Sequence, residues 1–392
     1  MKIRSVIILN SHPIQYFAPL YKKMANESNI DLMIWYCSDE SIRGEVDKGF
    51  NSKVKWDIPL LDGYKSRFLK NYSPISSIYK GFWGLINLKV IKLLYKQPKS
   101  IVWIHGWSYF THIITIIFAK LFGHTVCLRA ETPLNQELIK PKFFILFKNI
   151  ILKILFIFVD KFLYIGKQNF DFYKSLNISD DQLIPVLYCV DNDRFREVFE
   201  HTNKQEAREK LVIHSSKKII LFSGKYIKKK RPMDLLKAFT KINNKDSILI
   251  MLGDGEMRKE MEDFITYNKL TDDVILTGFV NQSLIPFYYR AADLFVMCSG
   301  SGETWGLSVN EAMNFGIPVI VSDICGCSID LIENDKNGNI FQMGDLDALT
   351  KLIDKYTNLE KDKLKIMEDF CFQKINQYNY SQIISTINII NK

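Results

Sequence analysis

Residues 298–323, CSGSGETWGLSVNEAMNFGIPVIVSD, decide the fold of this 392-residue chain. The pattern predicts the end of a strand, a glycine-rich loop, a helix over Gly306 to Asn314 and a buried strand over Ile317 to Ser322. Glycines in the loop let the backbone turn tightly and approach a ligand. The helix that follows would point its first N–H groups at the loop, and such groups attract anions. The stretch therefore predicts an anion site between a strand and a helix.

Two carboxylates flank this predicted anion site, Glu303 in the loop and Glu311 on the helix. Because a phosphate repels both, we interpret them as hydrogen-bond acceptors for hydroxyl groups on either side of it. Phosphate in the middle with hydroxyls at both ends describes a nucleotide sugar. The structural alternative is that Ser308-x-x-Glu311 is a capping box and that the glycines serve only the turn. The loop is not the dinucleotide fingerprint, because its third glycine lies one residue too far along for G-x-G-x-x-G.

The composition is typical of a globular protein with two domains. The length exceeds what one hydrophobic core usually supports, and 47% of the residues are hydrophobic while 24% are charged. We find no repeat period or low-complexity tract. The seven cysteines are an odd, scattered set, as expected of a reduced cytosolic protein. Cys325-Gly-Cys327 has no second pair and no nearby histidine, which argues against zinc.

Hydropathy and charge predict a cytoplasmic protein with an anionic partner. The N-terminus has an apolar run too short for a signal peptide, and no stretch reaches the roughly 18 apolar residues of a membrane-spanning helix. The net charge of +9 suits nucleic acid, a phosphorylated substrate or an anionic lipid surface.

Three predicted strands in the first half end in polar side chains. His12 follows a strand over Arg4 to Leu9, His105 ends a strand that begins at Ser100, and Arg129 follows a strand that begins at His124. In an open α/β sheet the carboxyl ends of the strands face the ligand crevice, so we expect all three residues near a site. The alternatives are loop histidines without a function and a surface ion pair between Arg129 and Glu131.

The connections in this half are less regular. Residues 38–77 are polar, aromatic and too long for an ordinary connection, so we expect them to line an acceptor site. Residues 79–96 are predicted to be helical. A longer apolar segment, Pro141 to Gly166, predicts a helix that stops around Val159. On a helix it would place Lys142, Asn149, Lys153 and Asp160 on one narrow stripe. It is either a core helix or an apolar, lysine-edged surface that lies on an anionic membrane.

The second half repeats the alternation of strands and helices. A strand over Lys218 to Ser223 ends in Gly224 and Lys225, and a basic loop leads through Lys230 to Pro232, a residue that suits a first helical turn. A turn between strand and helix can fold both lysines towards one anion. We therefore predict two doubly wound parallel sheets, in two Rossmann-like domains that face each other across a cleft.

The domain boundary is predicted where the composition becomes strongly charged. Residues 1–190 form the first domain, 191–216 a linker and 217–375 the second domain, and we expect a terminal helix in 376–392 to pack back on the first. Asp191-Asn192-Asp193 is formally a D-x-D, a metal motif in some enzymes. Its place in a polar linker favours a solvated turn.

Four motifs in the second half of the chain resemble, in their order and spacing, the C-terminal domain of family 4 retaining glycosyltransferases, which have the GT-B fold. They are FSGKYIKKKRPMDLLKAF, MLGDGEMR, LTGFV and ETWGLSVNEAMNFGIPVIVSD, spread over residues 219–341. The first half matches more loosely, through His105, VDNDRF and the general layout. The chain departs from the family at Asn10-Ser11-His12-Pro13, where a glycine-rich loop is usual, and at Lys225, where arginine is usual.

The resemblance implies a role for each matching residue. Glu303 would bind donor-sugar hydroxyls, Glu311 would accept from the ribose, and Lys225 and Lys230 would clamp the diphosphate. His105 would contact the sugar near the reacting carbon, which places it with Lys225, Lys230 and Glu303 in the expected catalytic set. The remaining expected contacts are the donor-binding residues Gly224, Thr304, Trp305, Gly306 and Leu307 and, on the acceptor side, His12 and Arg129.

The resemblance also implies an activity. The expected protein is a retaining glycosyltransferase that needs no metal or other cofactor and moves a sugar from a nucleotide sugar, a UDP-sugar before a GDP-sugar, to a glycan. We expect a lipid-linked acceptor in O-antigen, lipopolysaccharide or capsule synthesis at the inner face of the cytoplasmic membrane, with Phe143 to Val159 touching that surface. The alternatives are another GT-B enzyme, of the epimerase or phosphorylase type, and a basic nucleic-acid-binding protein; the spread of the basic residues argues against the latter.

Overall fold

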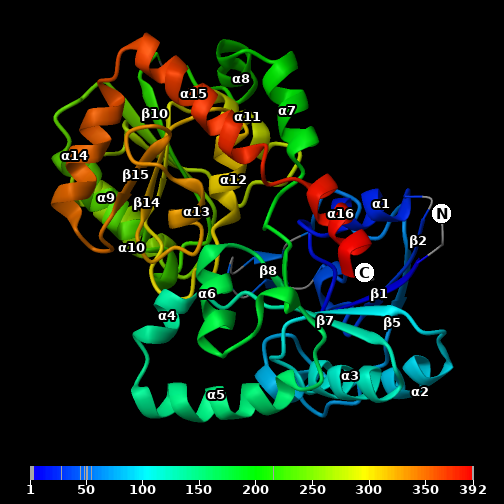
Figure 1. Ribbon diagram of the computed structural model, residues 1–392. Helices are drawn as coiled ribbons and strands as arrows, with labels where there is room; N and C mark the ends of the chain where they lie inside the picture. Colours follow the sequence, from blue (N-terminus) through cyan, green and yellow to red (C-terminus); the bar gives the residue numbers. More distant parts are fainter. Residues whose placement is uncertain are drawn as a thin grey trace. The chain divides into compact units, whose positions relative to one another are not determined.

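The computed structural model describes residues 4–27, 29–44, 46–47, 49, 52–53, 55–214 and 216–390. It divides into two compact units (Figure 1). Unit 1 comprises residues 1–45, 58–187 and 380–392, and unit 2 comprises residues 46–57 and 188–379. Each unit has its own parallel sheet, which confirms the predicted pair of doubly wound α/β domains.

Unit 1 is built on a sheet of seven parallel strands. In spatial order these are β5 (Lys65–Phe68), β2 (Ile30–Tyr36), β1 (Arg4–Asn10), β6 (Ile101–His105), β7 (Thr125–Arg129), β8 (Lys161–Tyr164) and β9 (Leu183–Pro185). The central strands are continuous runs of buried apolar residues, as expected for a sheet that is covered on both faces. The chain adds β2 and β5 on one side of β1 and then crosses to β6 on the other side. The order in which strands are added therefore reverses between β1 and β6, while all strands remain parallel.

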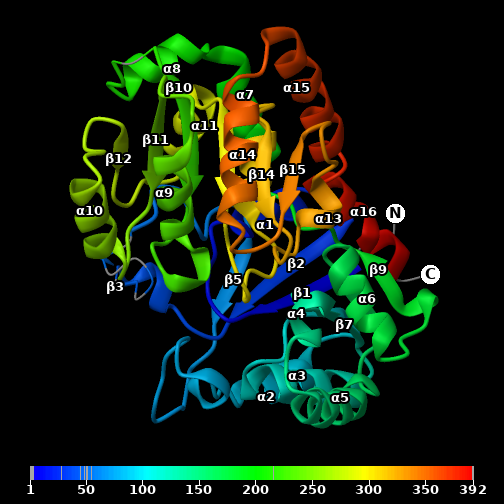
Figure 2. The ribbon, with the colours of Figure 1, turned by 90° about the vertical axis from the view of Figure 1, so that its left-hand side faces the viewer.

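Helices cover both faces of this sheet. Figure 2 shows α2, α3 and α5 on one face and α1 and α16 on the other. The helical segments of unit 1 are α1 (Ala18–Ala25), η1 (Glu40–Ile42), η2 (Gly81–Gly84), α2 (Lys89–Lys96), α3 (Phe110–Leu121), α4 (Leu134–Leu138), α5 (Lys142–Phe156), α6 (Lys167–Ser175), η3 (Asp180–Gln182) and α16 (Tyr380–Ile390). The C-terminal helix α16 belongs to this unit, where the hydroxyl of Tyr380 donates a hydrogen bond to the carbonyl of Tyr16.

Unit 2 is built on a sheet of six parallel strands with the same kind of reversal. In spatial order these are β12 (Val274–Leu276), β11 (Ser247–Leu252), β10 (Lys218–Ser223), β13 (Leu294–Met297), β14 (Val319–Ser322) and β15 (Gly338–Phe341). The reversal lies between β10 and β13. In a doubly wound sheet the ligand binds at the carboxyl ends of the strands at this point.

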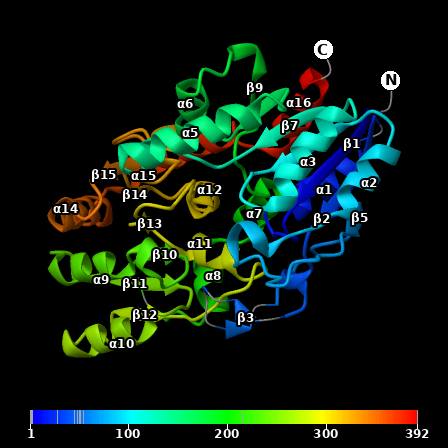
Figure 3. The ribbon, with the colours of Figure 1, turned by 90° about the horizontal axis from the view of Figure 1, so that it is seen from below.

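The helices of unit 2 form two groups on opposite faces of its sheet (Figure 3). One group contains α9 (Pro232–Lys241), α10 (Arg258–Tyr267) and α14 (Leu346–Thr357), and the other contains α7 (Asn192–His201), α8 (Lys204–Lys210), α11 (Ile285–Ala291), α12 (Leu307–Met313) and α15 (Lys361–Ile375). The remaining elements are β3 (Val46–Asp47), β4 (Ser52–Lys53), η4 (Lys228–Lys230) and α13 (Ser328–Leu331).

The segment predicted as a linker, residues 191–216, contains α7 and α8, which pack on unit 2. The carboxylate of Asp293 holds α8 by ion pairs with Lys204, at 2.6 Å, and Arg208, at 3.1 Å. The many charged residues of this segment therefore do not mark a solvated linker. They include the lysine and arginine that bind α8 to Asp293.

Residues 46–57 lie in the first half of the sequence but belong to unit 2. The ring of Trp56 packs edge-on against Phe279, with centroids 5.7 Å apart. The carboxylate of Asp57 accepts a hydrogen bond from the backbone N–H of Ser283 at 3.1 Å. This part of the irregular stretch 38–77 is thus tied to loops of the second sheet.

Two local predictions are wrong. Residues 79–96 form the short η2 and the helix α2 instead of one helix, because residues 85–88 between them are not helical. Asn87 is buried there, and its side-chain amide donates to the carbonyls of Cys37 and Leu69. The second concerns residues 330–341, whose composition predicts turns only, whereas Gly338–Phe341 form the strand β15.

Candidate functional site

In unit 2 the loops that follow β10 and β13 lie against each other at the reversal point of the sheet. The backbone N–H of Gly300 donates to the carbonyl of Lys229 at 2.7 Å, and the ammonium of Lys229 donates to the carbonyl of Gly302 at 3.0 Å. The ammonium of Lys230 forms an ion pair with the carboxylate of Glu303. The structure therefore brings together a lysine and a glutamate that stand 73 residues apart in the chain.

The Glu303 carboxylate is buried and ionised. Burial by itself would raise its pKa, but the positive charges of Lys230 and Lys229 outweigh that effect and lower the pKa below its ordinary value. The side chains of Lys230 and Glu303 are only 17% and 11% exposed, so water screens this pair weakly. A charged pair of this kind can exchange one partner for a charged or hydroxylated ligand without leaving a buried charge uncompensated.

Gly224 and Lys225 directly follow β10, which ends at Ser223, and lead into the same basic loop. A Cβ added to Gly224 would lie 3.6 Å from the Lys230 side chain. The turn is fixed by Tyr226, whose buried hydroxyl donates to the carbonyl of Met251 at 2.6 Å. Gly224, Lys225 and Lys230 therefore occupy one strand-end turn, as the sequence predicted.

The glycine loop continues into α12 through Gly306, which has a φ of +113°. A Cβ at this position would lie 2.8 Å from the sulfur of Met297, so both the backbone conformation and the space require glycine. No side chain caps the helix. The Glu311 carboxylate instead accepts a hydrogen bond from the hydroxyl of Tyr289 at 2.7 Å. The capping-box alternative for Ser308 and Glu311 is therefore wrong.

The backbone of Glu303, Thr304 and Trp305 rests on the turn at residues 325–327, which the sequence did not predict to be part of the site. The N–H of Gly326 donates to the carbonyl of Glu303 at 3.2 Å, and the N–H of Cys327 donates to the carbonyl of Trp305 at 3.1 Å. A Cβ on Gly326 would lie 1.8 Å from the carbonyl oxygen of Thr304. The Cys-Gly-Cys sequence is thus a close backbone support for the loop.

The indole of Trp305 points away from the loop and anchors α12. Its N–H donates to the side chain of Asn310 at 2.8 Å, and the amide of Asn310 donates to the carbonyl of Tyr188 at 2.9 Å. Leu307 is the first residue of α12 and is half-buried. Any donor contact of Trp305, Gly306 and Leu307 would therefore be made by their backbone.

The other predicted site residues, His105, Arg129 and His12, lie in unit 1. The ring of His105 stacks on Trp103, with centroids 5.7 Å apart. Arg129 forms the expected ion pair with Glu131 at 2.7 Å, but its side chain is buried rather than on the surface. His12 accepts or donates one hydrogen bond with the hydroxyl of Ser11 at 2.9 Å. His105 and Arg129 are neighbours in the register of β6 and β7.

Burial controls the protonation of His105. Burial lowers its pKa well below the ordinary value, and the nearby charge of Arg129 and the ring of His112 lower it further. The imidazole is therefore neutral at physiological pH.

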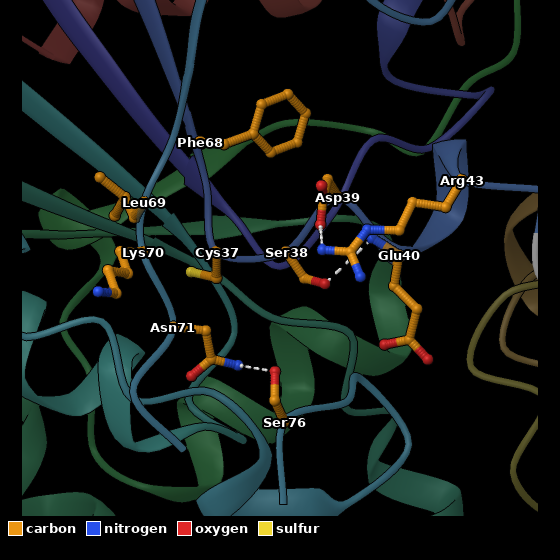
Figure 4. A pocket seen from close by; sticks show the side chains of 10 residues that line it. All are labelled: Cys37, Ser38, Asp39, Glu40, Arg43, Phe68, Leu69, Lys70, Asn71 and Ser76. Atoms are coloured by element: carbon orange, nitrogen blue, oxygen red, sulfur yellow. Dashed lines mark hydrogen bonds and ion pairs between the residues drawn. The ribbon is translucent and has the colours of Figure 1, made fainter. Parts of the chain in front are cut away.

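A polar cavity of about 480 Å³ opens in unit 1 near the ends of β2 and β5 (Figure 4). Two pairs of lining residues bond each other. The guanidinium of Arg43 forms an ion pair with the carboxylate of Asp39 at 2.5 Å, and the amide of Asn71 donates to the hydroxyl of Ser76 at 2.8 Å. The lining residues are Cys37, Ser38, Asp39, Glu40, Arg43, Phe68, Leu69, Lys70, Asn71 and Ser76. The cavity lies within the stretch expected to line an acceptor site, and neither His12 nor Arg129 is part of its lining.

The D-x-D motif has a structural explanation. The side chain of Asp191 caps α7 by accepting a hydrogen bond from the N–H of Arg194 at 3.3 Å, and the side-chain oxygen of Asn192 accepts from the amide of Asn314 at 2.9 Å. Among the residues that the structure describes, no group of three or more His, Cys, Asp and Glu side chains could hold a metal ion.

Known proteins match this chain mainly through unit 2. Residues 203–369 match the family of glycosyl transferases group 1. An uncharacterised glycosyltransferase of Methanocaldococcus jannaschii is 32% identical over 132 residues, which are 33% of this chain and 33% of that protein. The alpha-monoglucosyldiacylglycerol synthase of Streptococcus pneumoniae is 33% identical over 120 residues, 30% of this chain and 27% of the synthase. The chain thus matches at most about a third of the length of these two relatives.

Solved structures match the whole chain. The Anabaena protein HepE, crystallised with UDP, superposes with a TM-score of 0.74 at 15% identity, covering 99% of this chain and 98% of its own. The chain has the GT-B fold. Its two parallel sheets, each with a reversal of strand order, and its likeness to HepE define this class. Within that class, the match to the glycosyl transferases group 1 family falls on residues 203–369, which carry the basic loop and the glycine loop.

Proposed function

We propose that the protein is a retaining glycosyltransferase that uses a nucleotide-sugar donor, a UDP-sugar before a GDP-sugar. The observation that supports this most directly is the buried pair of Lys230 and Glu303, which joins the basic loop to the glycine loop where a doubly wound sheet binds its ligand. Lys230 and Lys225 would hold the diphosphate, Glu303 the hydroxyls of the sugar and Glu311 those of the ribose. The UDP complex of the structurally similar HepE is consistent with a uridine nucleotide.

The proposed reaction needs stabilisation of the charge that grows on the leaving diphosphate. The bond between the anomeric carbon and the β-phosphate oxygen breaks, and the acceptor oxygen bonds to the same face of that carbon. The departing phosphate oxygen takes the proton of the acceptor hydroxyl. Preorganised lysine ammonium groups stabilise the leaving group without a metal, so we propose metal-independent transfer.

The donor site is tested by thermal unfolding of the purified protein in the presence of UDP-glucose, other UDP-sugars and GDP-sugars. A bound donor stabilises the fold by mass action, and we expect UDP-sugars to raise the unfolding temperature. Lys230→Ala should remove this stabilisation, while Lys228→Ala, in the same loop but exposed, should retain it. Equal protection of both variants would overturn the assignment of the donor site.

We further propose that the acceptor is a lipid-linked glycan of the cell envelope, as in O-antigen or capsule synthesis, and that α5 lies on the membrane that carries it. The core-helix alternative for α5 is wrong, because only Leu152, Leu155 and Phe156 of this fully described helix are buried. Phe143 is 74% exposed and Ile154 is 59% exposed. Among the described residues, no helix combines the length and the apolar character that a membrane span requires.

Charge complementarity favours an anionic lipid surface for this helix. Lys142 and Lys153 on α5 are exposed beside the apolar side chains, and basic residues at an apolar helix face favour anionic lipid. We expect the protein to sediment with vesicles containing phosphatidylglycerol and to be released by salt. Phe147→Glu should abolish sedimentation, whereas Ile366→Glu, at an exposed apolar position of α15, should not. Sedimentation that Phe147→Glu leaves unchanged would exclude α5 as the contact.

A further inference from the structure

A chain of hydrogen bonds in unit 1 connects the ends of β1 and β6, at the point where the sheet reverses. It begins at Asn10, the last residue of β1, whose side-chain oxygen accepts a hydrogen bond from the backbone N–H of Ser11 at 2.8 Å. A backbone N–H can only donate, so this contact fixes which end of the amide is oxygen. The Asn10 nitrogen therefore faces the hydroxyl of Tyr21, to which it donates at 3.1 Å.

The direction of this bond determines the next one. The Tyr21 oxygen accepts from Asn10, and its hydroxyl proton points to the second polar neighbour, Nε2 of His105, at 3.3 Å. Burial raises the pKa of Tyr21, so the phenol keeps its proton. Nε2 of His105 is consequently the acceptor of the bond.

A neutral imidazole carries one proton, on one of its two nitrogens. Because the pKa of His105 is lowered by burial and by the charge of Arg129, the ring is neutral. With Nε2 accepting, the proton resides on Nδ1. The ring cannot easily turn over, since it is stacked on Trp103 and packed against Phe17 with centroids 4.6 Å apart.

We propose that Asn10 and Tyr21 are positioning residues that hold His105 as the Nδ1–H tautomer and thereby make it a hydrogen-bond donor to a hydroxyl of the sugar substrate. The substrate class rests on the proposed function, whereas the tautomer follows from the hydrogen bonds and from the neutrality of the buried ring. No described residue hydrogen-bonds Nδ1 of His105. The arrangement excludes His105 as the base that deprotonates the acceptor, because its one lone pair is engaged by Tyr21.

The neighbouring charged and titratable groups are consistent with a fixed tautomer. Arg129, beside His105 in the sheet, opposes a second proton on the ring and is itself neutralised by Glu131. Burial also lowers the pKa of His112, to about 4, so this ring is neutral. The hydroxyl of Tyr64 donates to the carbonyl of Leu60 and does not bond His105.

The test is nitrogen-15 NMR of the full chain labelled in its histidines, which number six. His105→Gln identifies the signals of His105. We expect Nδ1 to be protonated and Nε2 to be unprotonated in the wild type at neutral pH. Tyr21→Phe should move the proton to Nε2. Tyr64→Phe removes a neighbouring hydroxyl that does not bond Asn10, Tyr21 or His105, and should leave the proton on Nδ1.

The wild-type tautomer decides the inference without any substrate. Protonated Nε2 in the wild type, or an unchanged spectrum in Tyr21→Phe with retained unfolding temperature, would overturn it. If the donor screen yields a turnover assay, Tyr21→Phe should lower kcat about tenfold, the worth of one hydrogen bond, with KM for the donor nearly unchanged. If the protein shows the expected tautomer but binds none of the nucleotide sugars, the proposed function is refuted and the assignment of the His105 tautomer still holds.

Discussion

Replacing Lys230 by methionine is expected to destabilise unit 2 because it leaves the buried carboxylate of Glu303 without its nearest cation. Removing one partner of a buried ion pair costs about 3–5 kcal/mol. The two side chains are 17% and 11% exposed, and Lys229 remains nearby, so we expect a loss of about 3 kcal/mol, the lower end of that range.

Urea unfolding followed by tryptophan fluorescence, to which the buried Trp305 beside α12 contributes, measures this loss. The matched control is Lys228→Met, an exposed position of the same loop, where a change of less than about 0.5 kcal/mol is expected. The double variant Lys230→Met with Glu303→Gln should recover most of the loss, since both charges are then absent. A Lys230→Met variant no less stable than Lys228→Met would refute the reasoning.

The pH dependence of stability gives the same pair a second test. The pKa of Glu303 is below its ordinary value in the folded protein, so protons bind the unfolded chain more readily. The contribution of the ionised pair is therefore complete above about pH 4.5, the ordinary pKa of glutamate, and declines as the pH falls through the lowered value. In Lys230→Met the effect of burial is no longer outweighed, so the pKa of Glu303 should rise and this acid-dependent loss should begin at higher pH.

Three further predictions concern other parts of the chain. Asp191→Ala should cost about 1 kcal/mol in urea unfolding through the lost cap of α7, and a cost of zero would contradict the capping role. Sugar transfer should survive EDTA, whereas strict dependence on a divalent ion would restore Asp191 and Asp193 as a metal-site candidate. Asp57→Ala should speed amide hydrogen exchange at Ser283 while costing at most about 1.5 kcal/mol; unchanged exchange would show that residues 46–57 are not held through this contact.

The sequence alone predicted the parts of the site that follow from chain order. Alternation of strands and helices implies a doubly wound sheet, and such a sheet places its strand-end loops along one edge. Lys230 and Glu303 could therefore be expected on neighbouring loops. The glycine-rich turn before the helix was also predicted, but the sequence placed Gly306 inside the helix, whereas it precedes α12 with a φ of +113°.

What could not be predicted depends on packing between distant segments. Tyr289 stands 22 residues before Glu311, on a different helix. No local sequence pattern predicts that the Glu311 carboxylate accepts a hydrogen bond from Tyr289 instead of capping its own helix. Trp56 and Asp57 reach unit 2 from the first half of the chain for the same reason. For α5 the stripe of lysines was visible, but whether its apolar side chains face a core depends on elements elsewhere in the fold.

Donor binding should itself change the protonation of Glu303, which links the buried pair to the proposed activity. A diphosphate that shares Lys230 brings negative charge towards Glu303, so the pKa of this carboxylate should rise and the protein should take up a fraction of a proton. UDP-glucose is a suitable probe because its diphosphate does not titrate near pH 5. Calorimetry at about pH 5 in two buffers of different ionisation enthalpy measures the uptake. Glu303→Gln should abolish it, and proton release by the wild type would show that the phosphate does not approach this pair.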